Sequence, residues 1–128
     1  MVSLEELFAQ ARDNGIGDEF KALYDVLVKH GLIASPSKGT IYYKVSKDLL
    51  KTPNDPYNLL LWIEAKPRVE GRVRVRMDTS RFATYYPIGP LEARKMIGDD
   101  GSYDMDAKRV KLFVQEVDAL FAKIKSSE

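Results

Sequence analysis

The chain of 128 residues contains no cysteine. This absence excludes disulfide bonds, thiolate metal ligands and cysteine nucleophiles, and it is compatible with a reducing compartment. Long apolar runs are also missing, so no segment is predicted to cross a membrane as a helix. The first ten residues, MVSLEELFAQ, carry acids where a secretory signal would carry bases. We therefore expect a cytoplasmic protein that does not associate with membranes.

A strong net charge is absent as well, because 20 lysines and arginines face 19 aspartates and glutamates. Nucleic-acid-binding domains are usually much more basic, so nucleic acid is the less favoured partner. The one local excess lies in residues 66–81, where six bases face two acids. A hydrophobic content of 45% is ordinary for a globular chain, and the length suits one core. We predict a single domain over residues 1–128.

Two helices are predicted in the first 30 residues. Ser3 and Glu6 match a capping box, in which two side chains satisfy the backbone N–H groups at a helix start. Apolar residues then recur at helical spacing, which predicts a helix over about 4–13. The same spacing returns over about 18–30 and predicts the second helix.

Two further helices are predicted near the other end of the sequence. Pro90 suits the first position of a helix, and the pattern after it predicts a short helix over 91–97. An apolar stripe over residues 110–124 predicts the longest helix, with Asp104 or Asp106 as its cap.

Between these helix pairs the apolar period falls from 3.6 residues to two, which is typical of strands with one buried face. The pattern predicts strands over 41–46, 58–66 and 72–77, with a shorter fourth strand over 82–86. Short connections favour hairpins between consecutive strands. The predicted fold is therefore α+β: an antiparallel three- to four-stranded meander with an N-terminal helix pair and C-terminal helices packed on one face.

Residues 70–80 read EGRVRVRMDTS, in which three arginines alternate with apolar residues. If the apolar side chains face the helices, the arginines project from the opposite face at intervals of about 7 Å. Trp62 is predicted to share this outer face with Leu60, and Tyr42 lies on the neighbouring strand. The predicted partner-binding surface comprises Tyr42, Trp62, Arg72, Arg74 and Arg76.

The same arginines also fit a solvated face on which they pair with Glu64 or Asp78. Leu60 and Trp62 exposed together would be unusual on a monomer. We therefore expect a second subunit or the 47–57 connection to cover them. A solvated face, a protein partner or second copy, and nucleic acid remain open at this point.

A competing hypothesis is a domain that binds a small anionic ligand, since SPSKGT (35–40) contains lysine, hydroxyls and glycine. The segment lacks the spacing of a P-loop, so a plain turn is predicted there. If a ligand pocket exists, we expect it between sheet and helices. Its predicted residues are Lys38, Tyr43, Tyr86 and Tyr103.

No catalytic signature is present in the sequence. The single histidine, His30, has no serine and aspartate arranged around it as in a triad. The aspartates of residues 99–106 lack the ligand spacing of an EF-hand. We predict a non-enzymatic binding module with no cofactor and no metal site.

Four segments resemble an uncharacterised prokaryotic family of small α+β domains and cover most of the chain from residue 30 to 121. They are HGLIASPSKGTIYY (30–43), LLLWIEAKP (59–67), VRMDTSRFATYYPI (75–88) and EARKMIGDDGSYDMDAKRVKLFVQEVDALF (92–121). Tyr86-Pro87 fits the aromatic-proline pair of that family, whereas Ser102-Tyr103 stands where the family has Gly-Trp. The family has no established activity. The resemblance therefore implies the fold and carries over no catalytic residue; its matching positions are Lys38, Tyr43, Trp62, Phe82 and Tyr86.

Overall fold

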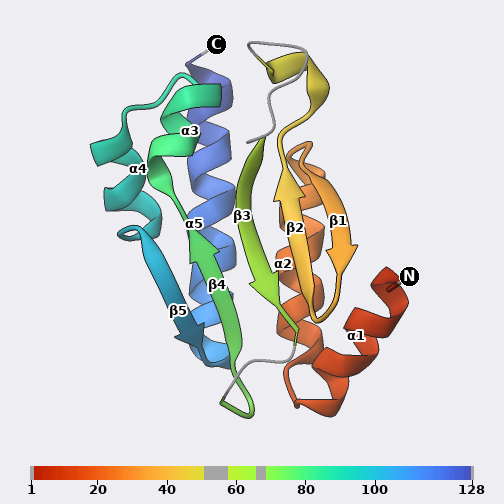
Figure 1. Cartoon of the computed structure of the whole chain (residues 1–128). Helices are drawn as coiled ribbons and strands as arrows, with labels where there is room; N and C mark the ends of the chain where they lie inside the picture. Colours follow the sequence, from red (N-terminus) through yellow and green to blue (C-terminus); the bar gives the residue numbers. More distant parts are fainter. Residues whose placement is uncertain (1, 51–57, 66–68, 128) are drawn as a thin grey trace.

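The structure, a computed structural model, describes residues 2–50, 58–65 and 69–127 (Figure 1). Neighbouring strands are antiparallel throughout the sheet, in the order β1-β2-β3-β4-β5. The strands are β1 (Ile33–Ser37), β2 (Thr40–Lys44), β3 (Leu59–Glu64), β4 (Val73–Met77) and β5 (Gly101–Met105). The helices are α1 (Leu4–Asp13), α2 (Gly17–Lys29), α3 (Thr79–Tyr85), α4 (Pro90–Ile97) and α5 (Ala107–Ser126), with a 3-10 turn η1 (Lys47–Leu49).

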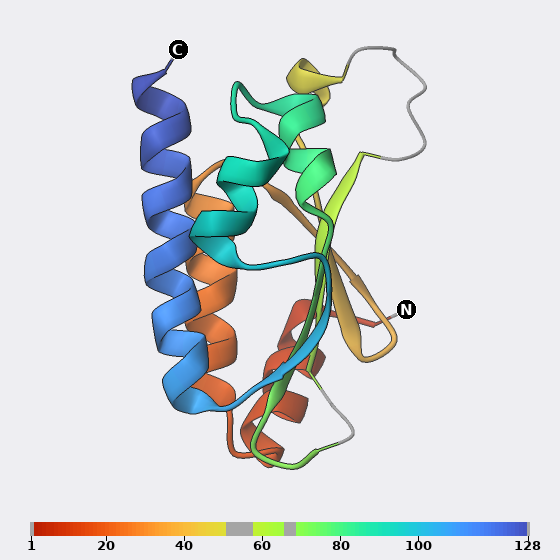
Figure 2. The same ribbon diagram turned by 90° about the vertical axis from the view of Figure 1, so that its left-hand side faces the viewer.

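The sheet is covered by helices on one side. Figure 2 shows α2 and α5 side by side along one face of the sheet, which in Figure 1 is the far face. The helices α3 and α4 lie at one end of the sheet, between β4 and β5 in sequence, and α1 lies close to α2. The predicted α+β class, the antiparallel meander and the N-terminal helix pair are confirmed, although the sheet has five strands. We call the face turned away from α2 and α5 the outer face.

The core lies between the sheet and the two long helices, as the period-two pattern predicts. The pairs Ile63–Val75 and Leu61–Met77 lie opposite each other on β3 and β4, and all four side chains are buried. Phe113 and five other apolar residues of α5 are buried with them. Burial of a side chain of this size stabilises the fold by about 1.5–3 kcal/mol.

The helix ends follow the capping chemistry of the sequence. The Ser3 hydroxyl accepts a hydrogen bond from the Glu6 N–H at 3.2 Å and starts α1 at the predicted residue. Asp106, one of two predicted caps, accepts from the Arg109 N–H at 2.8 Å and starts α5. Pro90 stands in the first turn of α4, where its missing N–H costs no hydrogen bond.

The predicted fourth strand over 82–86 is wrong, because these residues lie in and just after helix α3. The Asp78 side chain accepts from the Ser80 N–H at 3.1 Å and caps the helix start. Phe82 then packs one helical face into the core. A local cap with one buried aromatic therefore outweighs the strand preference of the Phe, Thr and Tyr residues.

Two strands at the sheet edges were not predicted. Ser35, Pro36 and Ser37, expected in a turn, lie in β1, which is an edge strand and tolerates a proline. Residues 101–105, expected to lead into the last helix, form β5 at the other edge. Both strands are short and largely polar, so they lack the apolar alternation that reveals a central strand.

One amide ties the β3–β4 hairpin to the N-terminal helices. The Asn14 side chain donates to the Arg72 carbonyl at 3.1 Å and accepts from the Gly71 N–H at 3.2 Å. The Asn14 carbonyl also accepts from Gly71 N–H at 3.1 Å.

Most of the 47–57 connection, residues 51–57, lies outside the described residues. In the described part of the chain, no helix is long and apolar enough to cross a membrane.

Candidate functional site

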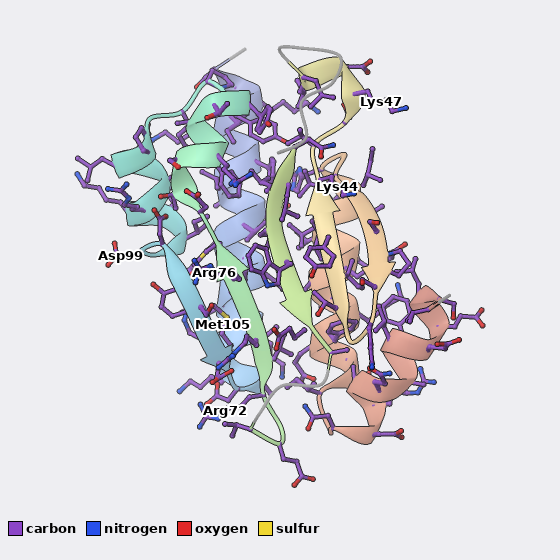
Figure 3. All side chains as sticks on the ribbon, in the orientation of Figure 1. Lys44, Lys47, Arg72, Arg76, Asp99 and Met105 are labelled. Atoms are coloured by element: carbon purple, nitrogen blue, oxygen red, sulfur yellow. The ribbon has the colours of Figure 1, made fainter. Side chains whose placement is uncertain are left out.

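The sheet register places aromatic and arginine side chains next to each other on the outer face. Tyr42 pairs with Trp62 across β2 and β3, Trp62 pairs with Arg76 on β4, and Arg76 pairs with Ser102 on β5. The alternate residues of these strands are buried toward the helices. We call Tyr42, Trp62, Arg76 and Ser102 the aromatic row (Figure 3, where Arg76 is labelled). The predicted shared face of the indole and the strand guanidinium groups is thus present in the fold.

Trp62 lies in the middle of the aromatic row. Its ring centroid is 5.9 Å from that of Tyr42, with the two ring planes tilted by 45°. On the other side, the Arg76 Cζ lies 5.8 Å from the Trp62 centroid, within the range of a cation–π contact. Arg76 also donates to the Ser102 hydroxyl at 3.2 Å. Arg76 is exposed and the two aromatic rings are half-buried, so the row is reachable from solvent.

The neighbouring residues form a second cross-strand row, in which acids flank an arginine. Arg74 Nε lies 3.1 Å from Asp104 Oδ1, and Glu64 stands opposite Arg74 on β3. The hydrogen bond to Asp104 raises the pKa of Arg74 above its ordinary value. We call Thr40, Glu64, Arg74 and Asp104 the charged row. Its acids compensate Arg74, so the outer face is not a continuous cationic stripe.

Arg72, the third predicted arginine, stands apart from both rows. It precedes β4 and is exposed at the end of the sheet (Figure 3). The predicted pairing of a strand arginine with Asp78 is replaced by an ion pair between Asp78 and Arg81 at 3.4 Å. Leu60, which we expected a second subunit or the 47–57 connection to cover, is buried within the single chain. Leu60 therefore needs no second subunit to cover it.

A small pocket lies beside the aromatic row. Its volume is about 110 Å³, and its lining includes Leu60, Trp62, Arg76, Asp78 and Arg81. Arg81 of α3 donates to the Leu59 carbonyl at 3.1 Å and brings α3 against this end of β3. An apolar wall next to guanidinium and carboxylate groups is suited to one inserted side chain rather than to a large cofactor.

The four residues of the predicted ligand pocket lie in separate places. Lys38 is exposed in the β1–β2 turn, and Tyr43 is buried in the core. Tyr86 lines a pocket with His30 and Phe121. Tyr103 lines a different one beside β5, and its hydroxyl donates to the Asp99 carbonyl at 2.7 Å. These two described pockets share no residue.

The Tyr43 hydroxyl is fully buried and has no hydrogen-bond partner within the described residues. Burial raises the pKa of Tyr43 far above its ordinary value, with smaller contributions from Tyr24 and Asp25. Since a buried polar group without a partner costs about 1–3 kcal/mol, we expect Tyr43→Phe to raise the free energy of unfolding by about 1 kcal/mol. Urea denaturation of both proteins measures this. A Tyr43→Phe protein less stable than the wild type would show that the hydroxyl is hydrogen-bonded in solution.

The side chain of His30, the single histidine, joins α2 to α5. His30 Nε2 lies 2.7 Å from Asp118 Oδ1, and its ring stacks on Phe121 with the centroids 4.8 Å apart. Hydrogen bonds from His30 and then from Lys29 lower the pKa of Asp118 below its ordinary value. The sequence alone did not indicate this cluster, because its two halves are separated by 88 residues.

The aspartates of residues 100–106 each have a structural partner. Asp100 Oδ1 accepts from the N–H and the hydroxyl of Thr79, at 2.7 and 2.5 Å. Asp104 pairs with Arg74, and Asp106 caps α5. In the ranges that the structure describes, no three histidine, aspartate or glutamate side chains gather closely enough to hold a metal ion.

A scan against protein-family models and searches of curated proteins and of solved structures found no match to this chain. The resemblance of residues 30–121 to a prokaryotic α+β family stays a prediction. The proposed function therefore rests on the chain's own residues.

Proposed function

We propose that this chain is a non-enzymatic interaction module that binds a protein partner through the outer face of its sheet. The observation that carries the proposal is the aromatic row, in which Tyr42, Trp62 and Arg76 are in contact on the face that no described helix covers. Trp, Tyr and Arg are the residue types that most often dominate the energy of protein interfaces. The lack of cysteine supports a cytoplasmic location for this interaction.

The surroundings of the aromatic row have the layout of a small interface. The half-buried rings form an apolar centre, and the charged row borders it with both signs of charge. The pocket beside Trp62 provides a place for one anchoring side chain of the partner. An apolar centre with polar groups at the rim is typical of protein interfaces.

The alternative functions receive less support from the arrangement of charges. Nucleic acid binding requires several cations directed at phosphates, whereas Arg74 is paired with Asp104 and faces Glu64. A small anionic ligand bound through Lys38 would need converging groups, and Lys38 is exposed in a turn.

Site-specific photo-cross-linking in cells tests the proposal. A benzophenone amino acid at position 42 is expected to yield a covalent adduct with a partner protein, because the side chain borders the centre of the row. The matched control carries the same group at position 112, a leucine 50% exposed on α5 and on the helix side of the fold. Equal adducts from both positions, or adducts from position 112 alone, would overturn the proposal.

Truncation of Arg76 measures how much this side chain contributes to binding of the partner protein. With the cross-linked partner purified, Arg76→Ala is expected to weaken binding about 30-fold, as loss of a central arginine does. The chain has one tryptophan, so the emission of Trp62 reports binding at the site itself. Lys111→Ala, an exposed cation on α5, is the control and should leave the affinity unchanged. Salt-dependent binding of an oligonucleotide that Arg74→Glu abolishes would instead identify nucleic acid as the partner.

A further inference from the structure

The two edges of the sheet differ in how they are protected. In β1, Pro36 lacks the backbone N–H that an added strand would need. The strand β5 contains no proline and no lysine, and its one charged residue, Asp104, is already paired with Arg74. Figure 2 looks onto this edge, where β5 runs in front of the sheet and no described element covers it. An uncovered strand edge is a template for a further strand.

We propose that β5 pairs antiparallel with β5 of a second copy of this chain, which joins the two sheets into one across a two-fold axis. This goes beyond the proposed function, because it uses the edge of the sheet and leaves the outer face free. In such a pair each residue contact occurs twice, related by the axis. The register is therefore described by the residue that lies on the axis.

Charge selects the register. With Tyr103 on the axis, Ser102 lies opposite Asp104 of the partner subunit, where the serine hydroxyl can donate to the carboxylate. With Asp104 on the axis, the two Asp104 carboxylates would face each other and destabilise the pair. The sequence of β5 thus favours pairing centred on Tyr103, with Gly101 opposite Met105 of the partner subunit.

The same register continues the charge pattern of the outer face. The aromatic row, ending in Arg76 and Ser102, runs on into the charged row of the second copy, which begins with Asp104 of the partner subunit. In the described part of the chain Arg76 has no carboxylate within ion-pair distance, and its hydrogen-bond partner is the Ser102 hydroxyl. Pairing brings a carboxylate to about 10 Å in Cα separation, two strands away, which a long arginine side chain can span. Bases and acids then alternate across the axis.

Sedimentation equilibrium of the full chain tests the pairing. We expect a reversible dimer, and we expect Ser102→Asp to raise its dissociation constant at least about tenfold, because two carboxylate pairs then face each other across the axis. Within one chain the new carboxylate lies beside Arg76, so the monomer should remain folded, which circular dichroism checks. Ser37→Asp, the same substitution on an exposed residue of β1, is the matched control and should leave the dissociation constant unchanged.

A measurement on the wild type makes the test independent of any variant. Amide hydrogen exchange of residues 101–105 is expected to slow as the protein concentration rises, while that of residues 33–37 stays constant. A chain that remains monomeric at millimolar concentration overturns the proposal. So does a dimer that Ser37→Asp weakens and Ser102→Asp does not, or one whose β5 amides exchange at a concentration-independent rate.

Discussion

Replacing Phe121 with alanine is expected to lower the free energy of unfolding by about 3–5 kcal/mol, at the upper end of the range for core truncations. Phe121 is 5% exposed, and three rings pack on it, one from the end of α2 and two from α3 and its C-cap. The centroids of His30, Phe82 and Tyr86 lie 4.8, 6.0 and 5.4 Å from that of Phe121. The cavity left by the missing ring would therefore loosen the packing of α2, α3 and α5 together.

Urea denaturation of the variant measures this loss. Leu112→Ala on the same helix is the matched control, because Leu112 is 50% exposed and its truncation should change stability by less than about 0.5 kcal/mol. If both variants lose equal stability, the effect belongs to the helix as a whole and not to the ring cluster.

Replacing Asp100 with alanine is expected to lower the free energy of unfolding by about 1–3 kcal/mol, although the Asp100 side chain is 42% exposed. The loss arises from Thr79, which is fully buried and donates both its N–H and its hydroxyl to Asp100. Arg94 donates to the Thr79 hydroxyl at 3.1 Å, and its guanidinium lies 3.9 Å from Asp100. Without the carboxylate, the Thr79 N–H at the start of α3 has no acceptor.

The same carboxylate gives stability a defined dependence on pH. The hydrogen bonds from the Thr79 hydroxyl and then its N–H, with Arg94 and Arg76 nearby, lower the pKa of Asp100 below its ordinary value. A lowered pKa in the folded state contributes stability that is complete above the unfolded pKa and is lost as pH falls through the folded pKa. Asp100→Asn keeps an acceptor oxygen but not the charge, so its stability should fall less steeply over this acidic range.

Thermal denaturation between neutral and acidic pH compares the wild type with the Asp100→Asn and Asp99→Ala variants. Asp99→Ala is the neighbouring control: its side chain is exposed, and its main-chain carbonyl still accepts from Tyr103. Its pH profile should match that of the wild type. An Asp100→Asn profile parallel to the wild type at every pH would remove Asp100 as the titrating group.

The sequence was most informative where structure is decided locally. Ser3 and Asp106 cap α1 and α5 as expected, because a cap and the apolar stripe after it lie within a few residues. The alternation of residues 72–77 correctly assigned the arginines of β4 to the outer face, since a strand places alternate side chains on opposite faces. Segment 82–86 was misjudged because its strand-favouring residues follow a capping aspartate.

The parts that the sequence did not predict depend on contacts between distant residues. Arg74 and Asp104 pair across 30 residues, and Asp104 was expected only as a helix cap. Nothing near residue 104 shows that β5 will return to β4 after two intervening helices. The contact of Arg76 with Trp62 follows from the pairing of β3 with β4, which fixes which outer side chains are neighbours.

Asn14 affects the proposed partner-binding surface although it lies outside both the aromatic row and the charged row. Slipping β4 by one residue along β3 would turn every side chain of the strand over, so that valines faced solvent and arginines entered the core. The Asn14 side chain is hydrogen-bonded to the backbone of Gly71 and Arg72, in the hairpin that sets the register between β3 and β4. A single side chain at the end of α1 thus helps to fix the register of β4 against β3, and with it the side chains that a binding partner contacts.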